Sequence, residues 1–369
     1  MNRFKSKCTS ALTLLVAAGA VQAQSLPTPQ MASMSSRPTS YQAVGKIVTA
    51  GSNPNAALYK TPAGTGYEGI GALFLTKSNG TFICSTTLML GGQYMLTAAH
   101  CLTNGSNAIN TSSVQGVMWN SSGVREILAA DSWYVHPQYT GEVIDAHDVA
   151  VVHLSTQFSS SITAGARNIY RGNPFGQVGE AVGNGTSGTG ATGGTIAPGF
   201  GLSNRRRGNN LVDLSWTDPA FAGFFGGGGA GSGFYGNADP YGLVADFDNG
   251  VAANDASCLI GGAFGISQFC NSGLGINEVS LGGGDSGGPL LIGGGVAGVA
   301  SYGLTFGRNF GDIDNSLNDT FGEFSGWAST EYNQQWLDNY VAPEPASVVL
   351  TATGLLAVMG GAWRRRRRK

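Results

Sequence analysis

Charged residues are scarce in this chain: Asp, Glu, Lys and Arg together make up 11% of its 369 residues. Basic residues are scarcer still away from the ends. Nine of the 20 lie in the first seven positions or in the closing run Arg364–Lys369, and only Glu344 of the 22 acidic residues lies beyond Pro343. The stretch from Gln24 to Pro343 therefore holds 11 basic and 21 acidic residues, a net charge of −10. The negative charge of this stretch excludes nucleic acid as a partner.

Cysteine is also rare, with five in the chain, whereas glycine is abundant, with 59. Cys8 lies in an expected export signal. The four that remain are Cys84, Cys101, Cys258 and Cys270. An even number in an exported chain predicts two disulfides, and four cysteines allow three pairings. Local pairing, Cys84–Cys101 and Cys258–Cys270, is the simplest.

Long apolar runs are confined to the two ends. Residues 1–23 have a basic start, an apolar centre from Ala11 to Val21 and a small-residue cleavage site, which predicts a secretory signal peptide. Residues 24–46, rich in Ser, Pro and Gln, are interpreted as a linker or pro-segment. Residues 342–369 hold the second run, Ala346–Trp363, and then Arg364–Lys369. This run is near the lower limit of a bilayer span, and the basic cluster favours a cytoplasmic end.

Between the ends, short apolar runs alternate with turn residues, which predicts an all-β barrel or sandwich. The runs in the first half are Ile70–Leu75, Phe82–Leu90, Tyr94–Leu96, Val114–Trp119, Val124–Ala129 and Val149–Leu154. A glycine-rich insertion at about 183–236 is expected to be mostly flexible, with an ordered surface element near the cleft as the alternative. Arg205–Arg207 within it is interpreted as a solvated charge cluster rather than a self-cleavage site. The spacing of Tyr332, Trp336, Leu337 and Tyr340 predicts a closing helix over Ser329–Val341.

The most informative stretch is Gly282-Gly283-Gly284-Asp285-Ser286-Gly287-Gly288-Pro289. A nucleophilic serine needs a tight turn, a bare hydroxyl and amide N–H groups aimed at the developing oxyanion, and flanking glycines provide these. A flexible glycine loop is the alternative. Two more stretches favour catalysis: His100 ends an apolar run beside Cys101, and Asp148 heads a β-branched strand. The order His, Asp, Ser is a known triad order.

With Leu96-Thr97-Ala98-Ala99-His100-Cys101 and Gly284-Asp285-Ser286-Gly287-Gly288-Pro289, the sequence resembles the trypsin/chymotrypsin family of serine endopeptidases. Asp148-Val149-Ala150-Val151-Val152 and Val135-His136-Pro137-Gln138-Tyr139 resemble two further motifs of the family. The resemblance covers about Ile47 to Tyr340. It implies two six-stranded antiparallel β-barrels of the chymotrypsin type with a C-terminal helix, in a protease domain over residues 47–341. It also supports the local disulfide pairing.

The resemblance implies a role in peptide hydrolysis for each residue of the predicted site. Ser286 attacks the peptide carbonyl, His100 moves the proton, Asp148 orients His100, and the N–H groups of Gly284 and Ser286 form the oxyanion hole. His136, His147, His153 and Asp145 are weaker rivals, because none has the same sequence context. Cleavage before Ile47, as in the family, would free an amine to pair with Asp285.

The resemblance also places the substrate site at Ser280, Ser301 and Gly303. Ser280 at the pocket floor is neutral, which predicts apolar or aromatic substrate side chains. Glu278 reaches the pocket only if its loop shifts. Gly282 stands where many relatives carry a cysteine, so the pocket rim lacks that brace.

The end at 342–369 resembles the PEP-CTERM sorting signal of Gram-negative bacteria, which an exosortase processes in the inner membrane. We therefore expect an exported, monomeric serine endopeptidase that acts on proteins or peptides, sorted to the surface or exterior through the export machinery and an exosortase. No metal or cofactor is needed, and the acidic stretch Asp312–Asp319 is interpreted as a polar loop, since it lacks the central glycine of an EF-hand. The alternatives are a non-catalytic surface or matrix protein and an esterase. The missing alternation of strands and helices disfavours an esterase of the α/β-hydrolase kind.

Overall fold

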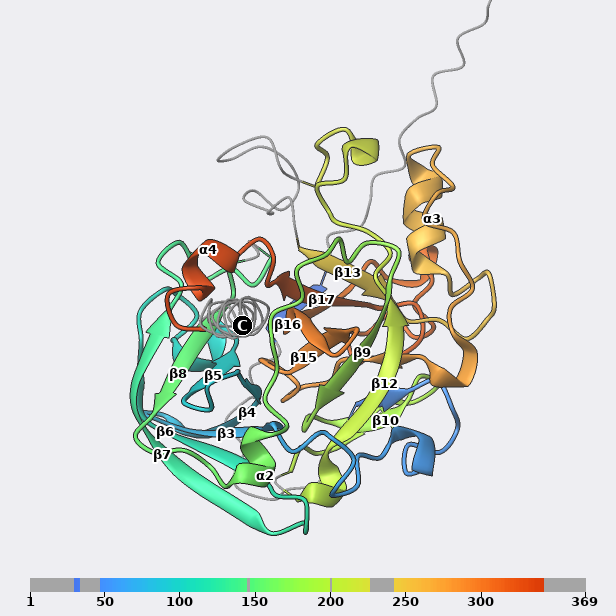
Figure 1. The fold of residues 1–369 in the computed structure, drawn as a ribbon. Helices are drawn as coiled ribbons and strands as arrows, with labels where there is room; N and C mark the ends of the chain where they lie inside the picture. The colour runs from blue at the N-terminus through green and yellow to red at the C-terminus, as the bar shows by residue number, and fades with distance from the viewer. Residues whose placement is uncertain (1–29, 34–46, 145–146, 200, 226–241, 342–369) are drawn as a thin grey trace, which may run out of the picture.

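The computed structural model describes residues 30–33, 47–144, 147–199, 201–225 and 242–341. Figure 1 shows two groups of strands side by side, β3 to β8 in one and β9 to β17 in the other. Few helices accompany them. The expected all-β fold of the chymotrypsin type is confirmed.

The first group is a closed barrel with strand order β3-β4-β5-β8-β7-β6. Its strands are β3 (Ile70–Lys77), β4 (Gly80–Leu88), β5 (Tyr94–Thr97), β6 (Thr111–Trp119), β7 (Arg125–Val135) and β8 (Ala150–Leu154). All neighbours in it pair antiparallel. Each strand overlaps one of the short apolar runs of the sequence. The run at β7 leaves Val124 and Ile127 exposed, whereas the other runs contribute side chains to the interior. Leu73, Met95 and Val152 are fully buried there.

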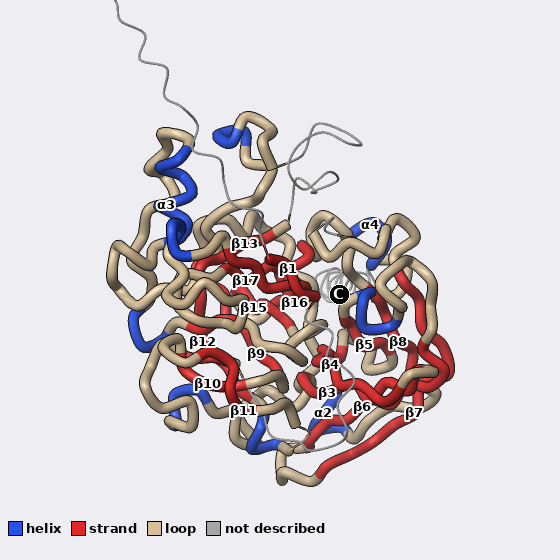
Figure 2. Tube along the Cα trace, turned by 180° about the vertical axis from the view of Figure 1, so that it is seen from behind, coloured by secondary structure: helices blue, strands red, loops and turns tan. Residues whose placement is uncertain are grey.

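The second group is built from two sheets rather than a second closed six-stranded barrel. The larger runs β12-β9-β15-β16-β17-β13, with β1 also pairing with β16, and the smaller runs β11-β10-β2-β14. The bounds are β1 (Gln30–Ser33), β2 (Val48–Thr49), β9 (Val178–Gly183), β10 (Ser187–Thr189), β11 (Gly193–Ile196), β12 (Arg206–Leu211), β13 (Leu243–Asp246), β14 (Val279–Ser280), β15 (Pro289–Ile292), β16 (Gly295–Thr305) and β17 (Phe324–Ser329). Figure 2 shows these sheets from behind.

Helices in the described residues are short. They are α1 (Ala99–Leu102), α2 (Ser160–Thr163), α3 (Ala256–Ala263) and α4 (Gln334–Leu337), with 3-10 turns at Ala57–Tyr59, Leu202–Asn204, Pro219–Phe221, Gly275–Asn277 and Arg308–Phe310. The predicted closing helix over Ser329–Val341 is therefore wrong in length. Ser329 pairs with Gly298 as the end of β17, and this ladder keeps the chain extended where the apolar spacing favoured a helix.

The glycine-rich stretch is not the flexible insertion that its composition predicted. From residue 183 to 225 it supplies β10, β11 and β12, while 226–241 lies outside the described residues. The prediction of a solvated arginine cluster is also wrong. Arg205 is fully buried, and its guanidinium donates to the carbonyl of Ile70 and the hydroxyl of Thr61, at 2.6 and 2.7 Å. The Ile70 carbonyl, at the start of β3, and the Thr61 hydroxyl thus replace water around this cation.

The termini lie outside the described residues, so the signal peptide and the C-terminal sorting segment remain predictions. Within the described residues, no helix has the length and apolar character needed to cross a membrane.

Candidate active site

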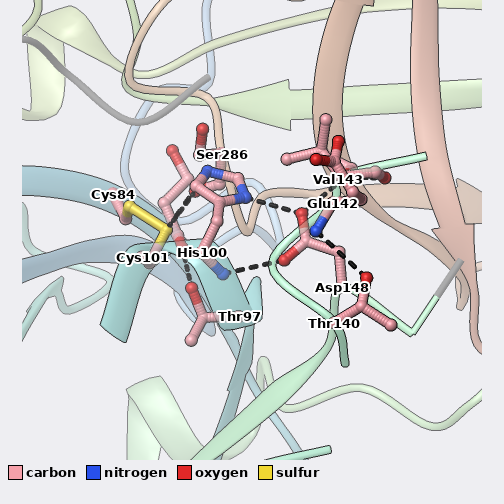
Figure 3. A network of polar contacts seen from close by, with 11 residues as sticks. Cys84, Thr97, His100, Cys101, Thr140, Glu142, Val143, Asp148 and Ser286 are labelled. Atoms are coloured by element: carbon pink, nitrogen blue, oxygen red, sulfur yellow. Dashed lines mark hydrogen bonds and ion pairs between the residues drawn. A yellow bond between two sulfur atoms is a disulfide. The ribbon is translucent and has the colours of Figure 1, made fainter. Parts of the chain in front are cut away.

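His100 and Asp148 meet between two elements of the closed barrel. His100 lies in α1, just after β5, and Asp148 lies just before β8, the strand that pairs with β5. The ring Nδ1 of His100 is 2.6 Å from Asp148 Oδ2, and the backbone N–H of His100 donates to Asp148 Oδ1 at 2.8 Å. Figure 3 shows both contacts. Because an ionised carboxylate only accepts, Nδ1 carries the proton and leaves Nε2 as the acceptor.

Ser286 lies beside His100 in the same close view (Figure 3). Cys101 Sγ lies 3.9 Å from His100 Nε2 and 3.8 Å from the Ser286 carbonyl oxygen. Among the described residues, the buried hydroxyl of Ser286 has no hydrogen-bond partner. A nucleophile–base hydrogen bond is often long before substrate binds. The structure thus brings the three predicted triad residues together, with the hydroxyl unengaged.

Ser85, on β4, holds the turn that carries Ser286. Its backbone N–H donates to the Ser286 carbonyl at 2.7 Å, and its hydroxyl donates to the Gly284 carbonyl at 3.1 Å. The same hydroxyl accepts the N–H of Asn184 at 2.9 Å. A residue of the closed barrel therefore fixes the turn that carries Ser286 in the second group. No motif in the sequence marks Ser85 for this role.

The proposed oxyanion donors are the N–H groups of Gly284 and Ser286. Within the described residues neither donates a hydrogen bond. Gly284 has φ +102°, and a Cβ there would lie 3.1 Å from Gly185 Cα and 3.2 Å from Pro198 Cβ. Only glycine fits both this backbone angle and this close approach. The turn therefore holds two backbone N–H groups beside the Ser286 hydroxyl, and neither has a hydrogen-bond acceptor among the described residues.

Asp285 is fully buried next to Ser286. Its carboxylate accepts the N–H groups of Gly185 and Gly282, at 2.6 and 2.8 Å, and burial raises its pKa to about 7. A Cβ on Gly185 would lie 2.6 Å from Asp285 Cγ. The glycine-rich stretch thus lets the backbone approach this carboxylate, a purpose that composition did not reveal.

Ile47 is fully buried immediately before β2, which pairs with β10 and β14. No ion pair joins Ile47 and Asp285 in the part of the chain that the structure describes. The nitrogen of Ile47 is in peptide linkage, so the activation pair remains a prediction.

Ser301 contacts the Asp148 carboxylate as well as belonging to the predicted substrate strand. Its hydroxyl lies 2.5 Å from Asp148 Oδ2 and 2.9 Å from the carbonyl oxygen of Val143. The Asp148 carboxylate therefore has three donors around it. The sequence suggested only the substrate role for Ser301.

We expect Ser301→Ala to lower kcat by about tenfold to a hundredfold with little change in KM. A hydrogen bond to a charged group contributes about 1.5–3 kcal/mol, and each 1.36 kcal/mol in the barrier is tenfold in rate. Steady-state peptide hydrolysis measures the change. Ser325→Ala is the matched control, because this buried serine on β17 contacts Ser280 instead. Equal losses in both variants would contradict a specific role for Ser301.

The predicted pocket floor is neutral. Ser280 is buried on β14, and its hydroxyl lies 3.0 Å from that of Ser325. Glu278 is turned to the neighbouring loop, where it accepts the N–H of Asp248 at 2.7 Å and that of Leu274 at 2.5 Å. It therefore offers no charge to the pocket. Burial, followed by the nearby carboxylate of Asp248, raises the pKa of Glu278 to about 8.

The raised pKa of Glu278 predicts that the free energy of unfolding falls as pH rises. Its folded-state pKa of about 8 exceeds the usual value of 4.5, so the folded state binds more protons between these two values. Stability is then highest at the acid end of this window and declines towards pH 8, by up to about 1.4 kcal/mol per pH unit from this group. Urea unfolding of Glu278→Gln should show a shallower decline than wild type. An unchanged slope, matching the exposed control Glu331→Gln, would contradict this account.

The other histidines do not join the triad. His136 is buried and stacks on His147, with ring centroids 4.4 Å apart, and burial lowers the pKa of His136 to about 4. His147 Nδ1 contacts Asn333 Oδ1 at 3.0 Å. His153 pairs with Asp131 at 2.6 Å, on the outside of the barrel. Asp145 lies outside the described residues.

Both expected disulfides are present. Cys84–Cys101 ties β4 to α1 behind His100, and Cys258–Cys270 ties α3 to the loop after it. The acidic loop at 312–323 also brings carboxylates together. Oxygens of Asp312, Asp314 and Glu323 lie within 4.8 Å of one another, but backbone and side-chain donors of the same loop already satisfy them.

A family model described as Trypsin matches residues 68–197. That stretch is trypsin-like. It contains the whole closed barrel from β3 to β8 together with His100 and Asp148, whereas Ser286 lies beyond it. The trypsin-like stretch agrees with the resemblance drawn from the motifs.

Among solved structures, one is titled neuropsin, a serine protease expressed in the limbic system of mouse brain. It is 15% identical, covers 76% of this chain and 97% of its own, and superposes with a TM-score of 0.48. No curated protein matches the sequence. What the site can do is therefore argued from its own residues.

Proposed function

We propose that this protein is an exported serine endopeptidase. The observation that carries the proposal is the contact of His100 Nδ1 with Asp148 Oδ2 at 2.6 Å, beside a Ser286 hydroxyl without a hydrogen-bond partner among the described residues. A serine, a neutral imidazole and an orienting carboxylate are the groups that acyl transfer needs. The trypsin-like match over residues 68–197 supports the same reaction class.

The reaction follows from these roles. Ser286 Oγ adds to the peptide carbonyl while its proton passes to His100 Nε2. Asp148 then stabilises the imidazolium, and the N–H groups of Gly284 and Ser286 bind the oxyanion. His100 returns the proton to the departing amine, which leaves an acyl ester on Ser286. Water activated by the same imidazole hydrolyses this ester and frees the enzyme.

Substrates are peptides or proteins with an apolar or aromatic side chain before the scissile bond. Ser280 supplies no charge to the pocket, and Ser301 and Gly303 lie on the strand that an extended substrate would follow. Cleavage before Ile47 frees an amine for Asp285, a buried carboxylate without an ion-pair partner among the described residues. The terminal signals direct export through the secretory machinery and sorting by an exosortase at the inner membrane.

The decisive experiment incubates the purified exported protein with a mixed peptide library and maps the cuts by mass spectrometry, beside Ser286→Ala. Cuts that need Ser286 support an endopeptidase and reveal its preference. Turnover of small esters but of no peptide would indicate an esterase. No cuts and no labelling by a fluorophosphonate would indicate a non-catalytic surface or matrix protein.

A further inference from the structure

The two edges of β16 are paired with other strands over different lengths. From Gly298 to Leu304 one edge pairs with β17. The other edge pairs with β15 only as far as Val299, and the Ser286 turn extends this pairing by one residue, since Gly287 donates to the Ala300 carbonyl and Ala300 to that of Gly288. Beyond Ala300, β15 and its turn leave this second edge without a partner.

Strand β1 occupies that vacated edge. It pairs antiparallel with β16, in the register Gln30↔Thr305, Met31↔Leu304, Ala32↔Gly303 and Ser33↔Tyr302. Because β17 takes the opposite edge of β16 at 302–304, β1 continues on the side of β15 and the Ser286 turn. Figure 2 shows β1 next to β16 from behind.

The direction of β1 is that of a substrate. From its N-terminus to its C-terminus, β1 runs alongside β16 from Thr305 towards Tyr302. Its C-terminal end therefore lies nearest to Ser301, which contacts Asp148, and to the Ser286 turn. An extended peptide added to this edge in the same sense is led to the nucleophile. Strand addition of this kind takes its affinity from main-chain hydrogen bonds and accepts many sequences.

We propose that residues 30–33 are a built-in competitive inhibitor of the enzyme, bound where the substrate strand must lie. This inference rests on the proposed function. Tethering gives such a segment an effective concentration of the order of millimolar, so even a weak four-residue pairing blocks the edge.

The covalent connection of residues 30–33 to the rest of the chain also explains how inhibition ends. Residues 30–33 precede Ile47, which is buried in the body and held there by β2. Residues 24–46 contain no cysteine, so no disulfide retains them after a cut before Ile47. Such a cut lowers the local concentration of the segment to that of the bulk protein and opens the edge to other chains.

The test compares the exported full chain with its Met31→Pro/Ala32→Pro variant. Successive N–H groups of a strand point to opposite sides, so two prolines remove whichever one β16 accepts. The control, Met31→Val/Ala32→Val, keeps both N–H groups. A small fluorophosphonate measures whether Ser286 reacts, and hydrolysis of extended peptides measures access to the edge. We expect the proline variant to show a KM about tenfold lower with kcat unchanged, and the valine control to behave as wild type.

A synthetic peptide of residues 24–46, added to the proline variant, should restore the high KM competitively. Equal KM values in all three chains, with no inhibition by the peptide while fluorophosphonate labels Ser286, would overturn the inference and leave the protease function standing. Failure of fluorophosphonate to label any of the chains, both before and after a cut in front of Ile47, would overturn the protease function, and the inference with it.

Discussion

Ser286→Ala is expected to reduce kcat for peptide hydrolysis by about a millionfold, the loss typical of removing the nucleophile from an enzyme of this kind. The remaining groups still bind substrate, so KM should change little. Labelling by fluorophosphonate should disappear, because the reagent needs the hydroxyl. Steady-state hydrolysis and active-site titration measure both effects.

The same substitution should leave stability unchanged. The Ser286 hydroxyl has no hydrogen-bond partner among the described residues, and the Ser286 carbonyl keeps its bond from the Ser85 N–H. Thermal unfolding of Ser286→Ala should therefore match wild type. Ser280→Ala, at the pocket floor, is the control and should retain most of kcat. Rates within a factor of ten of wild type for Ser286→Ala would exclude Ser286 as the nucleophile.

Asp148→Asn has the second largest expected effect, a fall in kcat of about 10⁴-fold. The Asn amide oxygen can take the place of Oδ1 and still accept the His100 N–H. Its NH₂ group then replaces Oδ2 and faces His100 Nδ1 as a donor. The imidazole must present its lone pair at Nδ1 and carry its proton on Nε2, so it cannot accept the proton of Ser286.

Kinetics of Asp148→Asn should show this loss in kcat, with circular dichroism and thermal unfolding near those of wild type. The control is Asp131→Asn, which alters the exposed pair with His153 and should leave kcat unchanged. A loss of less than tenfold for Asp148→Asn would mean that another group orients His100. Among the described residues, Ser301 is the side chain that shares the Asp148 oxygen with His100.

Local patterns in the sequence predicted much of the closed barrel. Each of its strands, β3 to β8, overlaps a short apolar run bounded by turn residues. Such runs are informative because pairing and burial act on consecutive residues. The residues of the proposed triad were found in the same way, since each lies in a motif a few residues long. Their catalytic roles stay predictions until the variants are measured.

Patterns failed where distant segments compete for one residue. The spacing of Trp336 and Tyr340 favoured a helix from Ser329, yet Ser329 belongs to β17 because Gly298 pairs with it. Arg205 looked solvated because its neighbours are charged, yet carbonyls from another part of the chain surround it. Burial of a polar group depends on partners that local sequence does not name.

The motifs of the sequence predicted the reacting groups of the proposed triad, His100, Asp148 and Ser286. The cysteine spacing favoured the two disulfides that the structure contains. Tertiary structure alone brought Ser301 to Asp148, Ser85 to the Ser286 turn, and the backbone of Gly185 to Asp285. It also set β1 on the edge of β16, more than 250 residues further along the chain. The reason is physical: a motif specifies the chemistry of one short segment, whereas these contacts join segments that only the packed sheets bring together.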